Sequence, residues 1–173
     1  MNAQHLSKSN EWWTPLPIVN AAREVMGSID LDPASSDAAN QWVGASKYHT
    51  AQDSGLLHHW RGNVFLNPPG GKDGNRTNMV RFWDKLVCEW SQGRTSQAVF
   101  VAFSLEALQT TQTIYRPIME FPFCVPKRRM AFIPGDGQKA TQPTHSNAIV
   151  YLGPNKDKFR SVFSRFGAVV IPS

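Results

Sequence analysis

A short apolar run that ends in two prolines constrains the fold of this chain more than any other feature: Val64–Leu66 is followed by Asn67-Pro68-Pro69-Gly70. Such a run predicts a buried strand, and the prolines end it sharply because they cannot continue a ladder of backbone hydrogen bonds. The first proline also biases Asn67 toward an extended backbone. We therefore predict a rigid turn at the carboxyl end of a strand, where open α/β sheets bind their ligands.

The chemistry of this turn is that of a hydrogen-bond acceptor. It would present the Asn67 amide oxygen and one or two carbonyl oxygens that accept no hydrogen bond from an N–H group of the turn. Such acceptors suit an exocyclic amine, the group that adenine carries at N6 and cytosine at N4. An ordinary Asn-Pro turn has the same residues. Features elsewhere in the chain are therefore needed to distinguish an amine-binding turn from an ordinary one.

Helix and strand patterns alternate in the first half of the chain, and strands cluster near its end. This order predicts an α/β fold whose mostly parallel sheet has an antiparallel end. The predicted helices cover residues 15–26, with Thr14 as N-cap, and residues 36–42, 79–90 and 156–166. The predicted strands cover residues 28–31, 63–66, 97–103, 123–125, 130–133, 148–152 and 168–171. We expect loops at 70–78, next to the turn, and at 134–146.

Length and composition limit the class of protein. A chain of 173 residues with 41% apolar and 18% charged residues predicts one folded domain over residues 1–173, without a separate target-recognition domain. The apolar run Ala98–Phe103 is too short to span a bilayer, and the polar amino terminus lacks the apolar core of a secretion signal. Cys88 and Cys124 form no CxxC pair, so neither a disulfide framework nor a zinc site is indicated. We expect a cytosolic protein.

The charges are unevenly distributed. Residues 1–60 hold three Lys or Arg and six Asp or Glu, a net charge of −3, whereas residues 61–173 hold fifteen and seven, a net charge of +8. The basic part favours a polyanionic partner such as nucleic acid, although solubilising charge on exposed helix faces is the alternative. The acidic first third is more typical of a pocket for a cationic or hydroxyl-rich ligand.

Three local features accompany the turn. Glu11-Trp12-Trp13-Thr14-Pro15 offers an aromatic face, a hydroxyl and a helix start that can hold a carboxylate, or it simply caps a helix with core tryptophans. Asp32, followed by Pro33, Ala34 and Ser35, is a carboxylate at a strand end that could bind a ribose hydroxyl or an amine, or open a turn. Asp53, before Ser54-Gly55-Leu56-Leu57, could accept from an adenine amine or open a turn.

Together these segments resemble the phage-type DNA N6-adenine methyltransferase (Dam-like) family. The resemblance rests on Trp13-Thr14-Pro15, Leu31-Asp32-Pro33-Ala34-Ser35, Asp53–Leu57 with Trp60, and Val64–Pro69. It implies a Rossmann-like class I methyltransferase fold, S-adenosylmethionine as cofactor and a flipped adenine of duplex DNA as substrate. It also implies a phage or prophage protein acting in the cytoplasm of a bacterial host, in the manner of a restriction-modification methyltransferase.

Carried over by position, the resemblance assigns two sets of residues. Asn67, Pro68, Pro69 and Gly70 would form the catalytic turn, with Asn67 and Pro68 receiving the N6 amine. The residues that would bind the cofactor are Trp13, Thr14, Pro15, Asp32, Pro33, Ala34 and Asp53.

This chain departs from the family pattern in two places. The family has an aromatic residue after the prolines that stacks on the base, and here Gly70 stands there; Phe132 is a candidate replacement, or else a core strand residue. No Gly-x-Gly cofactor loop is present, so Asp32–Ser35 either replaces that loop at the methionine end of the cofactor or holds the ribose.

The basic residues around the predicted loops are candidates for DNA contacts. They are Lys72, Arg76, Lys127, Arg128, Arg129 and Lys139. His58-His59 lacks the spacing of a metal site and is interpreted as surface polar, and we expect no metal requirement. The alternatives to adenine methylation are transfer to cytosine N4, to an RNA base or to a protein glutamine, and a catalytically altered protein that only binds DNA or cofactor.

Overall fold

The structure is a computed structural model that describes residues 11–110, 112, 114–135 and 145–173. The main sheet contains seven strands in the order β11-β8-β10-β7-β4-β2-β3. Five of them run in the same direction, and β10 and β11 run opposite to them. The predicted α/β class and the antiparallel end of the sheet are therefore confirmed.

The elements have the following bounds. The helices are α1 (Leu16–Met26), α2 (Asp37–Val43), α3 (Asn78–Ser91) and α4 (Lys156–Phe163), with short 3₁₀ turns at Gly55–Leu57, Leu105–Gln109 and Ile118–Glu120. The sheet strands are β2 (Leu31–Asp32), β3 (Lys47–Tyr48), β4 (Gly62–Leu66), β7 (Thr95–Ala102), β8 (Phe123–Pro126), β10 (Ala148–Leu152) and β11 (Gly167–Val170). Two small pairs lie outside it: β1 (Trp12–Trp13) with β9 (Ile133–Pro134), and β5 (Lys72–Asp73) with β6 (Arg76–Thr77).

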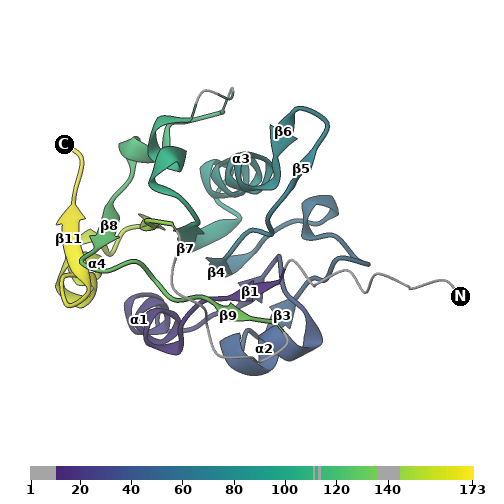
Figure 1. The fold of residues 1–173 in the computed structure, drawn as a ribbon, viewed down its shortest axis with the longest axis horizontal. Helices are drawn as coiled ribbons and strands as arrows, with labels where there is room; N and C mark the ends of the chain where they lie inside the picture. The colour runs from purple at the N-terminus through teal and green to yellow at the C-terminus, as the bar shows by residue number, and fades with distance from the viewer. Residues whose placement is uncertain (1–10, 111, 113, 136–144) are drawn as a thin grey trace, which may run out of the picture.

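The central strands are apolar on both faces because helices cover both faces of the sheet. In β7, Val99 and Val101 pack with α1 and α4, whereas Ala98, Phe100 and Ala102 pack with α3 on the opposite face. This division follows the two-residue period of a strand. Figure 1 shows α3 on one side of the sheet and α1 and α2 on the other.

The crossover connections create a crevice at one edge of the sheet. From β2 the chain passes through α2 to β3, toward one side of the sheet, and from β4 it passes through α3 to β7, toward the other side. Because such connections are right-handed, helices that lead in opposite directions lie on opposite faces. Ligands of open α/β sheets bind at this kind of switch point, which here lies between the carboxyl ends of β2 and β4.

Several predicted elements differ from the structure. Helix α1 begins at Leu16 with Pro15 as its N-cap, so the prediction that Thr14 caps it was wrong. The strand predicted at 28–31 is shifted to Leu31–Asp32, and of residues 130–133 only Ile133 is in a strand, which pairs with β1 outside the main sheet. The segment 70–78 is not simply a loop, because β5 and β6 form a hairpin in it. The predicted loop at 134–146 lies largely outside the described residues.

No helix in the described part of the chain is both long and apolar enough to cross a membrane.

Candidate functional site

A cavity of about 1150 Å³ opens at the carboxyl ends of β2, β4 and β7. Since β2 and β4 are neighbours and run parallel, Asp32 at the end of one and Asn67 just beyond the other emerge at the same edge. The cavity walls come from parts of the segments 11–14, 32–39, 50–56, 65–71, 77–82 and 103–104. The cavity is thus lined by the turn and by parts of all three accompanying sequence features, although not by Asp53.

The Asn67 side chain is held in one orientation. Its Nδ2 donates a hydrogen bond of 2.7 Å to the backbone carbonyl of Trp12, which crosses the cavity mouth in β1. No group of the described segments donates to Oδ1, so this oxygen is an available acceptor in the cavity. Beside it, Pro68 is buried, while Pro69 and Gly70 are exposed. All four residues of the turn line the cavity.

Asp32 is a carboxylate that is buried against the opposite wall. Its side chain is 4% exposed and accepts a hydrogen bond of 3.1 Å from the Ala34 N–H. Burial raises the pKa of Asp32 to about 7, although hydrogen bonds from Ala34 and Ser35 partly oppose the rise. Strand β3 supports this loop, because His49 N–H donates to the Asp32 carbonyl and Ser35 N–H donates to the His49 carbonyl.

Two buried polar atoms of residues that line the cavity have no hydrogen-bond partner among the described residues. They are Trp13 Nε1 and Thr14 Oγ1, and both residues line the cavity. Buried polar groups are nearly always paired in folded proteins, so unpaired ones on a cavity wall indicate a place for a polar ligand. Pro33 and Ala34 also line the cavity, whereas Pro15 caps α1 and does not.

Asp53 lies outside the cavity lining, although its neighbours Gln52 and Ser54 belong to it. The Asp53 carboxylate contacts His58 Nε2 at 2.6 Å and His49 Nδ1 at 3.2 Å, and the two imidazoles stack with ring centroids 4.3 Å apart at an angle of 4°. Hydrogen bonds from His58 and His49 lower the pKa of Asp53. One ligand atom from each of His49, Asp53 and His58 lies within 4.8 Å of the others, a spacing that could hold a metal ion, and the Asp53 carboxylate bridges the two imidazoles. His58 therefore has partners that the sequence pattern did not reveal.

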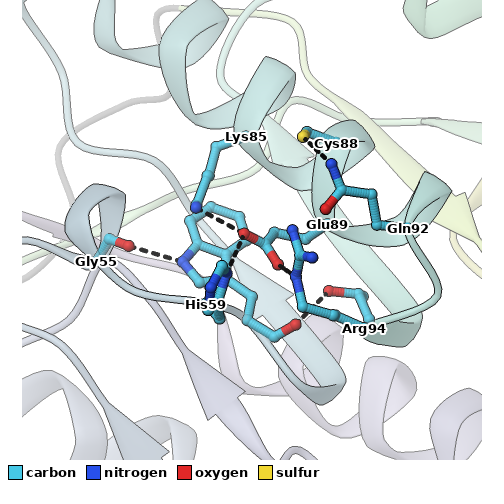
Figure 2. A network of polar contacts seen from close by, with 9 residues as sticks. Gly55, His59, Lys85, Cys88, Glu89, Gln92 and Arg94 are labelled. Atoms are coloured by element: carbon cyan, nitrogen blue, oxygen red, sulfur yellow. Dashed lines mark hydrogen bonds and ion pairs between the residues drawn. The ribbon is translucent and has the colours of Figure 1, made fainter.

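A second polar network lies beside Gly55, which forms part of the cavity wall. A Cβ atom at Gly55 would overlap the Pro33 carbonyl, so only glycine allows this approach, and Trp60 Nε1 donates 2.8 Å to the Gly55 carbonyl. Figure 2 shows the Glu89 carboxylate close by, between Lys85, His59 and Arg94. Burial alone would raise the pKa of Glu89, but hydrogen bonds from these three side chains lower it to about 2.

The predicted partner of the base, Phe132, is not part of the cavity wall. It is 7% exposed and belongs to the apolar core on the α1 and α4 face, where its ring meets that of Phe103 at 5.7 Å. Phe103 itself lines the cavity and is 37% exposed. The sequence pattern predicts Phe103 as the last residue of a strand, but β7 ends at Ala102, which leaves Phe103 at the same sheet edge as Asn67. Its position at the end of a central apolar run was the available signal.

None of the described candidate DNA-contacting residues lines the main cavity. Lys72 and Arg76 lie on the β5–β6 hairpin that follows the turn, where Arg76 pairs with Asp84. Lys127 and Arg128 follow β8 and line a separate cavity of about 310 Å³. Arg129 is exposed beside them, and Lys139 lies outside the described residues.

Comparison with known proteins assigns the chain to a family. Neither a curated protein nor a solved structure matches the chain significantly. A protein-family profile described as DNA N-6-adenine-methyltransferase (Dam) matches residues 3–167, which is nearly the whole chain. The chain therefore belongs to the DNA N-6-adenine-methyltransferase (Dam) family.

Proposed function

We propose that this chain transfers a methyl group from S-adenosylmethionine to the N6 amine of a flipped adenine in duplex DNA. The observation that carries the proposal is the Asn67 side chain, whose Nδ2 is engaged by the Trp12 carbonyl so that Oδ1 is left as an acceptor in the cavity. The family match supports the choice of adenine in DNA over another amine.

The cavity wall beyond Asn67 fits the proposed cofactor. S-adenosylmethionine carries a cationic sulfonium and an ammonium, and it supplies an electrophilic methyl carbon. The Asp32 carboxylate, buried without a cationic partner in the described segments, would accept from the ammonium or from a ribose hydroxyl. Thr14 Oγ1 and Trp13 Nε1, both unpaired, would complete the polar contacts, and the small residues Pro33 and Ala34 allow close approach. The Rossmann-like class I label suits the mixed sheet and the position of the crevice.

The turn would activate the amine by orientation. The lone pair of an aromatic amine is delocalised into the ring, which makes the nitrogen a poor nucleophile. Hydrogen bonds from its two N–H groups to Asn67 Oδ1 and to the Pro68 carbonyl would favour a pyramidal nitrogen with an available lone pair. That nitrogen would then take the methyl group that S-adenosylmethionine supplies. The sulfur would leave as a neutral thioether with the electrons of the broken C–S bond, and the nitrogen would release its proton to solvent. Alignment and fixed dipoles thus account for the catalysis, without a covalent nucleophile.

Access to N6 requires the base to leave the duplex, at a cost on the order of a few kcal/mol. Contacts to the DNA backbone would offset this cost, and the exposed cations at the same sheet edge, Lys72, Lys127 and Arg128 among them, are suited to phosphates. We propose that residues 1–173 act as one methyltransferase domain of this kind.

The test is transfer of labelled methyl groups to DNA, followed by nucleoside analysis. The expected product is N6-methyladenine, and Asn67→Ala should nearly abolish its formation while cofactor affinity stays within a few-fold. Asn20→Ala, an exposed asparagine on α1 outside the cavity, is the matched control. If the labelled methyl group is found in cytosine, RNA or protein glutamine, that group is the substrate instead of adenine. If the protein binds DNA or cofactor but transfers no methyl group, it has lost catalysis.

A further inference from the structure

The catalytic turn proposed above leaves one face of the target base without a partner. Gly70 occupies the position directly after the prolines and has no side chain, and a Cβ atom built on it meets nothing within 4 Å. Stacking on an aromatic ring is the usual way in which proteins hold an unpaired base. A ring from another part of the cavity is therefore required.

Five aromatic side chains line the cavity, and they differ in how much of the ring is accessible. Phe65 and Phe82 are 1% and 5% exposed, so their rings belong to the core. Trp13 packs against Trp42 and is half-buried. Only Trp12 and Phe103, at 40% and 37%, expose a large part of the side chain among the described lining residues.

The order of the strands distinguishes Phe103 from Trp12 as a partner for the base. Asp32 ends β2, Asn67 follows β4 and Phe103 follows β7, and the three strands are neighbours in that order. A cofactor bound at Asp32 would therefore lie on one side of Asn67, and the base would lie on the other, toward Phe103. Leu66 in β4 pairs with Phe100 in β7, and Pro69 and Phe103 each follow their member of this pair by three residues. The carbonyl of Trp12 also reaches Asn67, but its neighbours Glu11 and Trp13 contact Ser36 and Trp42 in and before α2, the helix that follows Asp32.

Phe103 is also held in place by its neighbours. Its ring contacts Phe132 at 5.7 Å and His145 at 4.7 Å, between centroids. Its carbonyl accepts a hydrogen bond of 2.7 Å from Asn147 Nδ2, and the Oδ1 of the same buried asparagine accepts from the Met130 N–H at 3.1 Å. An apolar ring that is packed against two other rings and still lines the cavity with 37% of its surface exposed is preorganised to stack on a flat ligand.

We infer that Phe103 provides the stacking surface for the flipped base, in place of the aromatic residue missing at Gly70. This inference rests on the proposed function. It also gives Phe132 a role, that of supporting the Phe103 ring from the core.

The experiment compares Phe103→Ala, Phe103→Leu and Phe103→Tyr in steady-state methylation of DNA, with cofactor affinity measured by calorimetry. The alanine and leucine variants should lower kcat/KM for DNA by about 10- to 100-fold, since one base–aromatic contact is worth that much. The tyrosine variant should stay within a few-fold of the parent, and cofactor affinity should not change in any of them. Tyr115→Ala, which removes an aromatic that is 65% exposed outside the cavity, is the matched control.

A second-site variant separates loss of stacking from local damage. Adding Gly70→Tyr to Phe103→Ala should recover much of the lost rate, because the space at Gly70 is open and a ring there would again face the base. Parent-like rates in Phe103→Leu, or a loss in Trp12→Ala with none in Phe103→Ala, would overturn the inference. A parent chain that methylates no adenine would instead overturn the proposed function itself.

Discussion

Asp32 is a buried carboxylate whose charged form destabilises the folded state of the free protein but suits the binding of a ligand. Its pKa is about 7 in the folded chain, well above its ordinary value of 3.8, because burial disfavours the charged form. The folded state therefore binds a proton more tightly than the unfolded state does. The stabilisation from this proton is complete below pH 4 and is lost as the pH rises through 7. A cationic ligand would restore a favourable environment for the carboxylate.

Asp32→Asn should therefore stabilise the free protein while it damages the site. At pH 8 the free energy of unfolding should rise by up to about 4 kcal/mol, from about three pH units at about 1.4 kcal/mol each. Binding of S-adenosylmethionine should weaken by about 1–3 kcal/mol, the cost of losing a charged hydrogen-bond partner. Urea unfolding and calorimetry measure the two effects, with Asp157→Asn, a fully exposed carboxylate, as control. Unchanged cofactor affinity would exclude Asp32 from the site.

The pH dependence of cofactor binding should identify the group that Asp32 contacts. If the carboxylate pairs with the ammonium, affinity should rise between pH 5.5 and 7 by up to about tenfold per unit, since only the ionised form binds the cation. A ribose hydroxyl can also hydrogen-bond to the protonated form, which gives a shallower rise. Calorimetric titrations of the parent and of Asp32→Asn measure the difference between the two slopes. Affinity that falls over this range in the parent alone would contradict both assignments.

At the scale of elements, regular patterns predicted regular structure, and tertiary contacts decided the exceptions. The continuous apolar run of β10 and the apolar face of α3 are visible in the sequence, and both elements lie within a residue or two of their predicted bounds. Residues 130–133 have strand-like composition, but the side chains of Met130 and Phe132 are buried in the core. Among these four residues, only Ile133 has a strand partner, Trp13. That pairing joins residues 120 positions apart, which no local pattern contains.

The Glu89 network connects α3 to the cavity wall at Gly55, and its loss should destabilise the whole chain. Glu89→Gln keeps the shape of the side chain but leaves Lys85 and Arg94 without their buried anionic partner. Because the pKa of Glu89 falls from 4.5 to about 2, the charged form contributes about 3 kcal/mol at neutral pH, and this contribution is lost as the pH falls from about 4.5 to 2. Urea unfolding at pH 7 should show a loss of this size.

Glu120→Gln provides the comparison, since Glu120 forms an exposed ion pair with Arg116. Such surface pairs contribute at most about 1 kcal/mol. Equal losses in the two variants would mean that burial adds nothing to the Glu89 network.

At the scale of the whole molecule, the sequence pattern anticipated several residues that line the cavity, whose roles stay predictions, but not how distant side chains pack around it. Asp32 and Asn67 were identified from local patterns, and the parallel strands β2 and β4 bring them to one cavity. Trp13 and Thr14, also singled out in the sequence, reach the same cavity from β1, which lies outside the main sheet. The patterns could not show that Asp53 pairs with His49 and His58 outside the cavity lining, or that Phe132 packs beneath Phe103. Both depend on side-chain packing between distant segments. That residues 1–173 form a single methyltransferase domain remains a prediction.

The charge of the chain leads to a prediction about DNA binding. Residues 61–173 carry a net charge of +8, and Lys127 and Arg128 follow β8, which runs in the same direction as β4 and β7. These two cations therefore emerge at the edge of the sheet that holds the cavity. If both meet phosphates, Lys127→Ala with Arg128→Ala should flatten the slope of log affinity against log salt by about one to two units.

The matched control removes the same charge from the opposite edge. Lys156 and Lys158 lie in the first turn of α4, which follows β10, and β10 runs antiparallel to β7, so the two lysines are at the far edge of the sheet. Lys156→Ala with Lys158→Ala should leave the slope unchanged, although the net charge falls equally. Fluorescence anisotropy of labelled duplex DNA between 50 and about 300 mM salt measures both slopes. Equal slopes in the two double variants would place the DNA away from the β8 end of the cavity edge.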